Sequence, residues 1–249
     1  MKTLQNWFET PLGRLLAAVE RQALDHHLDR WAGATLLQIG GFGDGQRVLR
    51  ANTSRQWLVG RSAESKVDCV LRPEQLPFQS NTMDIVVLVH SLEFSDNPHR
   101  VLREAERVLA PEGYLLVLSF NLLSLWGCAH ALPALQRRGA PWNGEYFTSR
   151  RVRDWLTLLD LTTISVEHLF YRPPINRSRL QQRLLPMENW AARVVPWFGG
   201  VHLTVAQKHV AGMTPLRPVL WRRRRLVAGG LAQPTSRKPL DVALRRDIQ

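Results

Sequence analysis

The stretch from residue 83 to residue 120 places the strongest constraint on the fold. It begins with MDIVVLV, continues with a helical pattern and ends with YLLVLSF. Two apolar runs of strand length around a helix are typical of a crossover between parallel strands. Within the helical part Asn97 is a suitable N-cap and Pro98 fits the first turn. Pro111 and Gly113 are expected to end the helix.

Similar apolar runs recur along the chain, namely LLQI, QWLVG, DCVL, TISVEHLF and VHLTVAQ. The middle ones alternate with helical patterns, which predicts a mostly parallel sheet with helices on both faces. The last two, around residues 163–170 and 202–208, are not separated by a helix of the earlier kind. We expect them to form an antiparallel pair at one edge of the sheet. Residues 12–31 have the spacing of an amphipathic helix, and a further helix is predicted to start at Thr148 or Ser149.

A glycine-rich segment, LLQIGGFGDGQ, follows the first predicted strand. Many nucleotide-binding folds begin with a strand that runs into such a turn. Glycines allow a ligand to approach the backbone closely, because they have no side chain. A tight turn with no ligand is the alternative explanation. The glycines concerned are Gly40, Gly41, Gly43 and Gly45.

The positive charge is confined to the last third of the chain. Residues 1–169 hold 18 Lys/Arg and 18 Asp/Glu, so they are neutral. Residues 170–249 hold 15 Lys/Arg against three acids, so the whole net charge of +12 lies there. Its densest part is the run of four arginines at 222–225.

Composition also changes near Gly212, after which Pro, Gly, Ser and Arg dominate. We therefore predict one domain over residues 1–212, with an N-terminal helix within 1–31 and a sheet core over 36–208. Residues 213–249 are predicted to be a basic, largely disordered tail.

Several classes of protein are disfavoured. Cys69 and Cys128 lie far apart, which favours two buried thiols in a reducing compartment over a disulfide. No signal peptide is recognised, and no His, Cys or carboxylate spacing fits a metal site. Residues 114–135 carry no charge, but Asn121 and Pro133 favour a buried strand and helix over a membrane span. A cytoplasmic location is expected.

The segment LPFQSNTMDIVVLVHSLEFSDNPHRVLREAERVLAPEGYLLVLSFN resembles the middle of class I S-adenosylmethionine-dependent methyltransferases of the type 11 kind. The shared parts are the L-P-F turn, a D-x-V strand from Asp84 to Val89, and RVLAPEG at the end of the helix. A looser resemblance extends from residue 36 to about residue 208. It implies a Rossmann-like fold, a mostly parallel seven-stranded sheet with an antiparallel edge strand, and S-adenosylmethionine as the cofactor. It also implies methyl transfer to an acceptor that the sequence does not name.

In such a sheet the ligand lies beyond the carboxyl ends of the strands, where the strand order reverses. The loops there supply the residues that we predict to bind the cofactor, namely Gln38, Gly40, Gly41, Gly43, Arg61, Arg72, Leu76 and His90. No catalytic residue is assigned, because methyl transfer depends chiefly on positioning. His90 and Tyr146 are candidates to touch the acceptor, with packing roles as the alternative.

The sequence departs from the family pattern where the cofactor is expected. Gln38 replaces a carboxylate and Phe42 replaces a glycine. Arg61 and Arg72 stand where the family carries acids that accept hydrogen bonds from the ribose and the adenine. Arginine has donors only, and its charge opposes the sulfonium. We therefore predict altered cofactor binding, with Glu74 as a substitute for the acceptor that is missing at Arg72.

Two other functions compete with methyl transfer. One is an inactive binding module whose basic tail, residues 213–249, binds nucleic acid or an anionic surface. The other is an NADP-binding protein, because Arg61 follows the second strand where an arginine can accept the 2′-phosphate.

Overall fold

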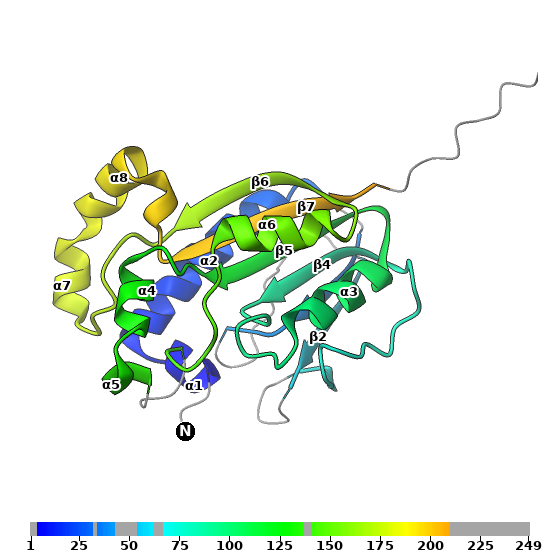
Figure 1. Cartoon of the computed structure of the whole chain (residues 1–249), viewed down its shortest axis with the longest axis horizontal. Helices are drawn as coiled ribbons and strands as arrows, with labels where there is room; N and C mark the ends of the chain where they lie inside the picture. Colours follow the sequence, from blue (N-terminus) through cyan, green and yellow to red (C-terminus); the bar gives the residue numbers. More distant parts are fainter. Residues whose placement is uncertain (1–3, 32–33, 43–53, 62–66, 137–140, 210–249) are drawn as a thin grey trace, which may run out of the picture. The chain divides into compact units, whose positions relative to one another are not determined.

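Seven strands of the computed structural model form one sheet (Figure 1). The structure describes residues 4–31, 34–42, 54–61, 67–136 and 141–209. The strands lie in the order β3-β2-β1-β4-β5-β7-β6. Their bounds are β1 Thr35–Ile39, β2 Arg55–Gly60, β3 Cys69–Val70, β4 Met83–Val89, β5 Leu109–Phe120, β6 Leu161–Leu169 and β7 Val201–Lys208.

The pairing of the strands confirms the predicted fold class. Strands β1 to β5 pair in parallel, whereas β7 is antiparallel to both β5 and β6. The antiparallel pair lies at one edge of the sheet, with β6 outermost and β7 as the reversed strand. The order reverses between β1 and β4, so the crevice predicted for the ligand lies beyond the carboxyl ends of these two strands.

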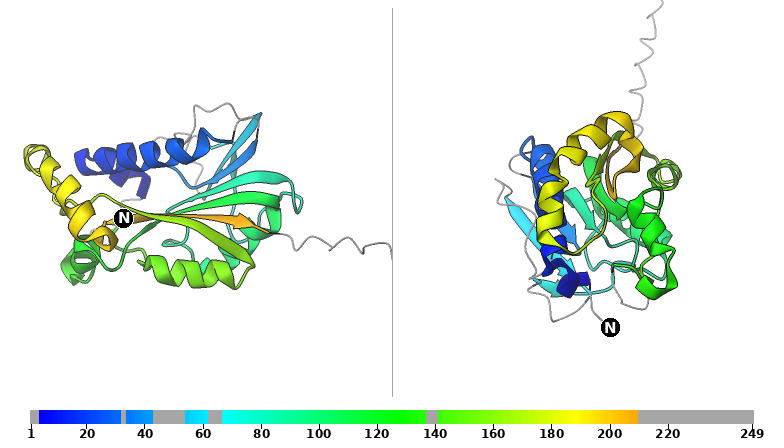
Figure 2. Two further views of the ribbon diagram at one scale, coloured as in Figure 1. Left: turned by 90° about the horizontal axis from the view of Figure 1, so that it is seen from above. Right: turned by 90° about the vertical axis from the view of Figure 1, so that its left-hand side faces the viewer.

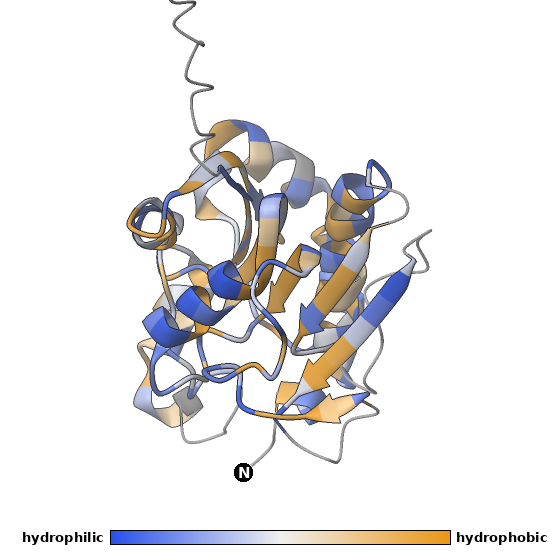
Figure 3. Cartoon of the chain, turned by 90° about the vertical axis from the view of Figure 1, so that its right-hand side faces the viewer, coloured by the Kyte–Doolittle hydropathy of each residue, from blue (hydrophilic) through white to orange (hydrophobic). Residues whose placement is uncertain are grey.

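Helices cover both faces of the sheet (Figure 2). Their bounds are α1 Leu4–Phe8, α2 Pro11–Leu28, α3 Pro98–Val108, α4 Leu125–His130, α5 Pro133–Gln136, α6 Ser149–Thr157, α7 Ser178–Arg183 and α8 Leu185–Val194, with a 3-10 turn, η1, at Pro196–Phe198. In β4, Ile85, Val87 and Val89 pack with α1 and α2, whereas Val86 and Leu88 pack with α3 and α6. The alternation of side chains along a strand divides the core in this way. In Figure 3 the central strands are coloured mostly as hydrophobic.

The helix predicted over residues 12–31 is present as α2, but a separate short helix, α1, precedes it in the N-terminal region. Helix α1 ends at Phe8, and α2 begins at Pro11. The Thr10 hydroxyl accepts a hydrogen bond from the Gly13 amide at 3.1 Å, which caps α2. Pro11 has no backbone N–H, so it fits the first position of a helix and does not continue one.

Helix α3 begins where the sequence predicts, but it ends earlier. The Asn97 side chain accepts from the Arg100 amide at 3.1 Å, as expected of an N-cap. The last helical residue is Val108, although Pro111 and Gly113 were expected to end it. Leu109 is already part of β5, where it pairs with Met83 of β4, so strand pairing ends the helix before the proline does.

The prediction of two buried thiols is wrong. Cys69 and Cys128 are both exposed and free. Cys69 lies in the two-residue strand β3, which pairs only with β2 among the described strands and leaves its side chains uncovered. Among the described helices, none is long and apolar enough to cross a membrane. The predicted tail, residues 213–249, lies outside the described residues.

Candidate functional site

The first described glycine of the loop after β1 is required by strand packing. Gly40 has φ +84°, in the region that favours glycine. A Cβ atom at Gly40 would lie 2.3 Å from the carbonyl oxygen of Val89, at the end of β4. Any larger residue would therefore force β1 and β4 apart. A valine substitution at Gly40 would test packing and not the approach of a ligand.

The structure explains why position 38 carries a glutamine where the family carries a carboxylate. The side chain of Gln38 is fully buried, and Nε2 donates to the carbonyl oxygen of Gly40 at 3.0 Å. An ionised carboxylate cannot donate, so an acid would not make this contact. Gly41 follows and is half-buried, whereas Gly43 lies outside the described residues.

Arg61 is held by the loops around it. Its Nη1 donates to the carbonyl oxygen of Phe94 at 2.6 Å, and its Nη2 is paired with the carboxylate of Glu74. The hydroxyl of Ser95 also donates to Glu74. Burial acts to raise the pKa of Glu74, but hydrogen bonds from Ser95 and its own backbone, with the charge of Arg61, lower it. The loops after β2, β3 and β4 thus meet at one carboxylate.

Arg72 and Leu76, which follow β3, were also predicted to bind the cofactor, and their surroundings differ. Arg72 is exposed and forms no ion pair with any described residue. Leu76 is buried in the apolar core beneath α3, and its amide donates to the Glu104 carboxylate at 2.9 Å. Its contacts are those of a packing residue.

His90 is at the centre of a buried charged cluster. Its Nε2 lies 2.9 Å from Glu20 Oε1, and its Nδ1 lies 3.0 Å from Glu93 Oε1. The side chains of all three residues are fully buried. Glu93 Oε1 also accepts a hydrogen bond from the amide of Phe120 at 2.7 Å. The Glu20–His90–Glu93 cluster therefore joins α2 to the carboxyl ends of β4 and β5.

The cluster holds a proton. Burial by itself would lower the pKa of His90, but the charges and hydrogen bonds of Glu20 and Glu93 raise it to about 10. The imidazole is therefore positively charged at neutral pH. Burial raises the pKa of Glu20, although the charge of His90 acts in the opposite direction.

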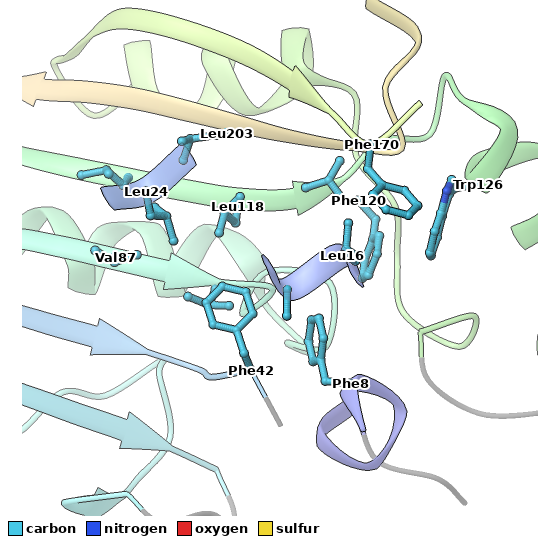
Figure 4. Packing of buried hydrophobic residues seen from close by; sticks show 14 of the residues in the cluster. Phe8, Leu16, Leu24, Phe42, Val87, Leu118, Phe120, Trp126, Phe170 and Leu203 are labelled. Atoms are coloured by element: carbon cyan, nitrogen blue, oxygen red, sulfur yellow. The ribbon is translucent and has the colours of Figure 1, made fainter. Parts of the chain in front are cut away.

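The backbone and the surroundings of His90 are unusual. Its φ is +47°, which residues other than glycine seldom adopt. Such strain persists only where neighbouring groups hold a residue in place, and it is common at functional sites. The ring of Phe120 stacks on His90 with centroids 4.2 Å apart, and Phe8 of α1 lies 5.8 Å away (Figure 4 shows both phenylalanines). Phe42, which replaces a glycine of the family, packs edge-on against Phe8.

Three buried polar atoms beside this cluster form no hydrogen bond with a described residue. They are Glu20 Oε2, Glu93 Oε2 and the hydroxyl oxygen of Tyr146. Tyr146 stacks on Phe120 with centroids 5.0 Å apart, so it shares a ring partner with His90. Buried polar groups without partners are costly and rare in folded proteins. A ligand with N–H or O–H donors would supply hydrogen bonds to these three oxygens.

The sequence singled out His90 and Tyr146, but it missed Glu20 and Glu93. A signal for Glu20 was present, because this acid lies on the apolar stripe of the helix between Leu16 and Leu24. Glu93 follows His90 by three residues in HSLEF, where nothing local distinguishes it from a solvated acid.

Comparisons with known proteins agree with this architecture. The family described as "Methyltransferase domain" matches residues 33–117. The uncharacterized protein YafS of Escherichia coli (strain K12) is 32% identical over 213 residues, which are 84% of this chain and 82% of YafS. The chain belongs to the class I methyltransferase superfamily. A shorter match, 44% identical over 48 residues, covers 19% of the chain and 17% of the mitochondrial 2-methoxy-6-polyprenyl-1,4-benzoquinol methylase of Caenorhabditis elegans.

Solved structures share the fold of this methyltransferase domain. One is a possible histamine N-methyltransferase from Thermotoga maritima, with a TM-score of 0.59, 19% identity, and coverage of 79% of this chain and 91% of that one. Another is the geranyl diphosphate C-methyltransferase of Streptomyces coelicolor A3(2), in complex with Mg²⁺, geranyl diphosphate and S-adenosyl-L-homocysteine. Its TM-score is 0.54 at 16% identity, with coverage of 78% of this chain and 81% of that one. At these identities the likeness shows the fold alone.

Proposed function

We propose that the chain transfers a methyl group from S-adenosylmethionine to an acceptor that has N–H or O–H groups. The observation that carries the proposal is the reversal of strand order between β1 and β4, in a chain that belongs to the methyltransferase superfamily. In this reaction the acceptor atom bonds to the methyl carbon as the carbon–sulfur bond breaks. The cofactor would supply the methyl group and be released as S-adenosylhomocysteine, and the proton of the acceptor would pass to solvent water.

Glu74 is the residue that we propose to hold the ribose of the cofactor. The family supplies a carboxylate after the second strand, and Arg61 stands there instead. The carboxylate of Glu74 reaches the same place from the loop after β3, because it pairs with Arg61. A carboxylate can accept hydrogen bonds from ribose hydroxyls, so Glu74 supplies the acceptor that the second strand lacks. The ribose would then share the Glu74 carboxylate with Arg61, and the two would compete for its lone pairs.

The electrostatics of the crevice are compatible with a cationic cofactor. Arg61 was predicted to repel the sulfonium, but its charge is compensated by the ion pair with Glu74. The Glu20–His90–Glu93 cluster adds two carboxyl groups against one imidazolium. The charge near the end of β4 is therefore not positive overall, and the cation does not meet unopposed arginine there.

The acceptor side of the crevice is proposed to lie at His90 and Tyr146. The unpartnered oxygens of Glu20, Glu93 and Tyr146 would accept hydrogen bonds from a bound donor. Phe8 of α1 lies beside this position, with its ring centroid 5.8 Å from that of His90. Because these three oxygens need hydrogen-bond donors, we infer an acceptor that has N–H or O–H groups and not a purely apolar one.

Calorimetric titration with S-adenosylhomocysteine tests the proposed role of Glu74. Glu74→Gln is expected to weaken binding about tenfold or more, because a charge-assisted hydrogen bond contributes roughly 1.5–3 kcal/mol. Arg61→Ala is expected to tighten binding, because it removes the competitor for Glu74. Glu145→Gln is the matched control, since Glu145 is exposed and its ion pair with Arg151 is 3.5 Å long.

The same titration decides between the proposed functions. No heat and no thermal stabilisation at millimolar S-adenosylhomocysteine, in folded protein, would refute methyl transfer. Tight binding of NADPH, lost in Arg61→Ala, would favour the dinucleotide alternative. Binding of S-adenosylhomocysteine that is unchanged in Glu74→Gln would leave methyl transfer standing and would remove Glu74 from the site.

A further inference from the structure

Exposed apolar side chains gather in two segments of the chain. Thirteen large hydrophobic side chains are exposed among the described residues, and nine of them lie within residues 122–132 and 175–197. We call these nine the apolar rim. They are Leu122, Leu123, Leu125, Leu132, Ile175, Leu185, Trp190, Val194 and Trp197. Surface hydrophobic residues scattered singly need no explanation, but a concentration of this kind does.

Hydrogen bonds hold the two segments together. The side-chain amide of Asn121 donates to the carbonyl oxygens of Leu123 and Trp197, at 3.1 and 3.0 Å. Trp126 of α4 donates to the carbonyl oxygen of Arg172 at 3.0 Å. Glu188 of α8 accepts from the Arg172 side chain at 3.1 Å. Helices α4, α5, α7 and α8 accordingly gather at the same end of the sheet in both Figure 1 and Figure 2.

The exposed charges on the second segment have one sign. Four arginines of residues 177–193 are exposed, and none forms an ion pair with a described residue; they are Arg177, Arg179, Arg183 and Arg193. The acid of this segment is Glu188, and its carboxylate is taken up by Arg172 and by the amide of Tyr171. The second segment of the apolar rim therefore carries uncompensated positive charge.

We propose that the apolar rim and these four arginines bind the surface of an anionic lipid bilayer. Tryptophan side chains favour the boundary between lipid headgroups and acyl chains. Aliphatic side chains such as Leu123 and Leu185 gain by entering the apolar layer, and arginines are attracted to the anionic headgroups. The segment thus has the composition of an interfacial, membrane-surface element that does not span the bilayer.

The composition of the rim favours a lipid surface over two other partners. Single-stranded nucleic acid is held chiefly by stacking on aromatic rings, but seven of the nine rim residues are aliphatic. A second copy of the chain would place the same four arginines on both sides of a symmetric contact, where they repel each other. An anionic bilayer is complementary both to the charge and to the apolar side chains. The inference does not depend on the proposed methyl transfer, and its test uses no cofactor.

Cosedimentation of the full chain with lipid vesicles tests the proposal. The vesicles are phosphatidylcholine with or without phosphatidylglycerol. We expect binding to the anionic vesicles and little binding to phosphatidylcholine alone. The double variant Trp190→Ala/Trp197→Ala is expected to bind the anionic vesicles roughly tenfold more weakly. Arg183→Glu and Arg193→Glu are each expected to weaken binding roughly fivefold at low salt.

Matched controls lie outside the rim. Trp57→Ala removes an exposed tryptophan of β2, Leu158→Ala removes a side chain that is 81% exposed beside α6, and Arg103→Glu reverses an exposed arginine of α3. These variants are expected to bind vesicles as the wild type does. Because every substituted side chain is exposed, all variants are expected to keep the wild-type melting temperature.

Three results would overturn the proposal. Wild-type binding by the tryptophan double variant would assign the vesicle binding to charge elsewhere in the chain. A rim-dependent dimer in light scattering, without vesicle binding, would make the rim a contact between copies. Binding of single-stranded RNA that exceeds vesicle binding and is lost in the double variant would make it a nucleic-acid surface.

Discussion

Raising the pH from 6.5 to 10 should lower the free energy of unfolding, by at most about 1.4 kcal/mol per pH unit for the one proton on His90. The folded-state pKa of His90 is raised to about 10 from 6.5. The protonated imidazole therefore stabilises the fold fully below pH 6.5, and this contribution is lost as the pH approaches 10. Denaturant unfolding across this range measures the effect.

The groups around His90 come from several elements. Glu20 approaches from α2, Glu93 follows β4, Tyr146 precedes α6, and His202 lies in β7. Burial and then the charge of His168 lower the pKa of His202 to about 3, so its effect on stability falls in the acid range below 6.5. Burial raises the pKa of the Tyr146 hydroxyl well above 10. The loss of unfolding free energy between pH 6.5 and 10 therefore reports on the Glu20–His90–Glu93 cluster.

His90→Asn isolates this contribution. Asparagine tolerates a positive φ and cannot carry a charge, so it removes the proton with little added backbone strain. We expect the variant to be less stable at neutral pH. Its free energy of unfolding should no longer fall between pH 6.5 and 10. His26→Asn, which changes an exposed histidine of α2, should leave the decline unchanged. An equal decline in His90→Asn would show that another group titrates in this range.

Glu93→Ala should be among the most destabilising single substitutions, costing about 3–5 kcal/mol. It removes the acceptor of the His90 ring at 3.0 Å and of the Phe120 amide at 2.7 Å. A buried cation and a buried N–H would then both lose a partner. Glu93→Gln should cost less, because its amide oxygen can still accept from the Phe120 amide. The midpoint of denaturant unfolding, at unchanged slope, measures both.

Glu145→Ala provides the contrast for Glu93→Ala. Glu145 is exposed and pairs with the exposed Arg151, so its loss should be nearly neutral. Similar midpoints for Glu93→Ala and Glu145→Ala would mean that the Glu20–His90–Glu93 cluster contributes little to the fold.

Local features of the fold could be predicted because they depend on chain neighbours. The caps at Asn97 and Thr148 are such features: each side chain accepts from the amide three residues later. The parallel sheet followed from apolar runs alternating with helices, and the resemblance over residues 76–121 added the family. Where a local prediction missed, as at Val108, the pairing of Leu109 with Met83 decided the boundary.

The sequence by itself determined the strands, most of the helices, the parallel sheet with its antiparallel edge pair, and the family, because periodicity and motif order lie within short stretches of chain. Only the tertiary structure decided what the unusual site residues do. Gln38 donates a hydrogen bond to the carbonyl oxygen of Gly40 in its own loop, and the charge of Arg61 is compensated by Glu74. The ring of His90 is held by Glu20, which lies in a helix 70 residues earlier in the chain. The charge and pKa of these groups depend on which partner lies within about 4–6 Å after folding, and spacing along the chain carries no information about that distance.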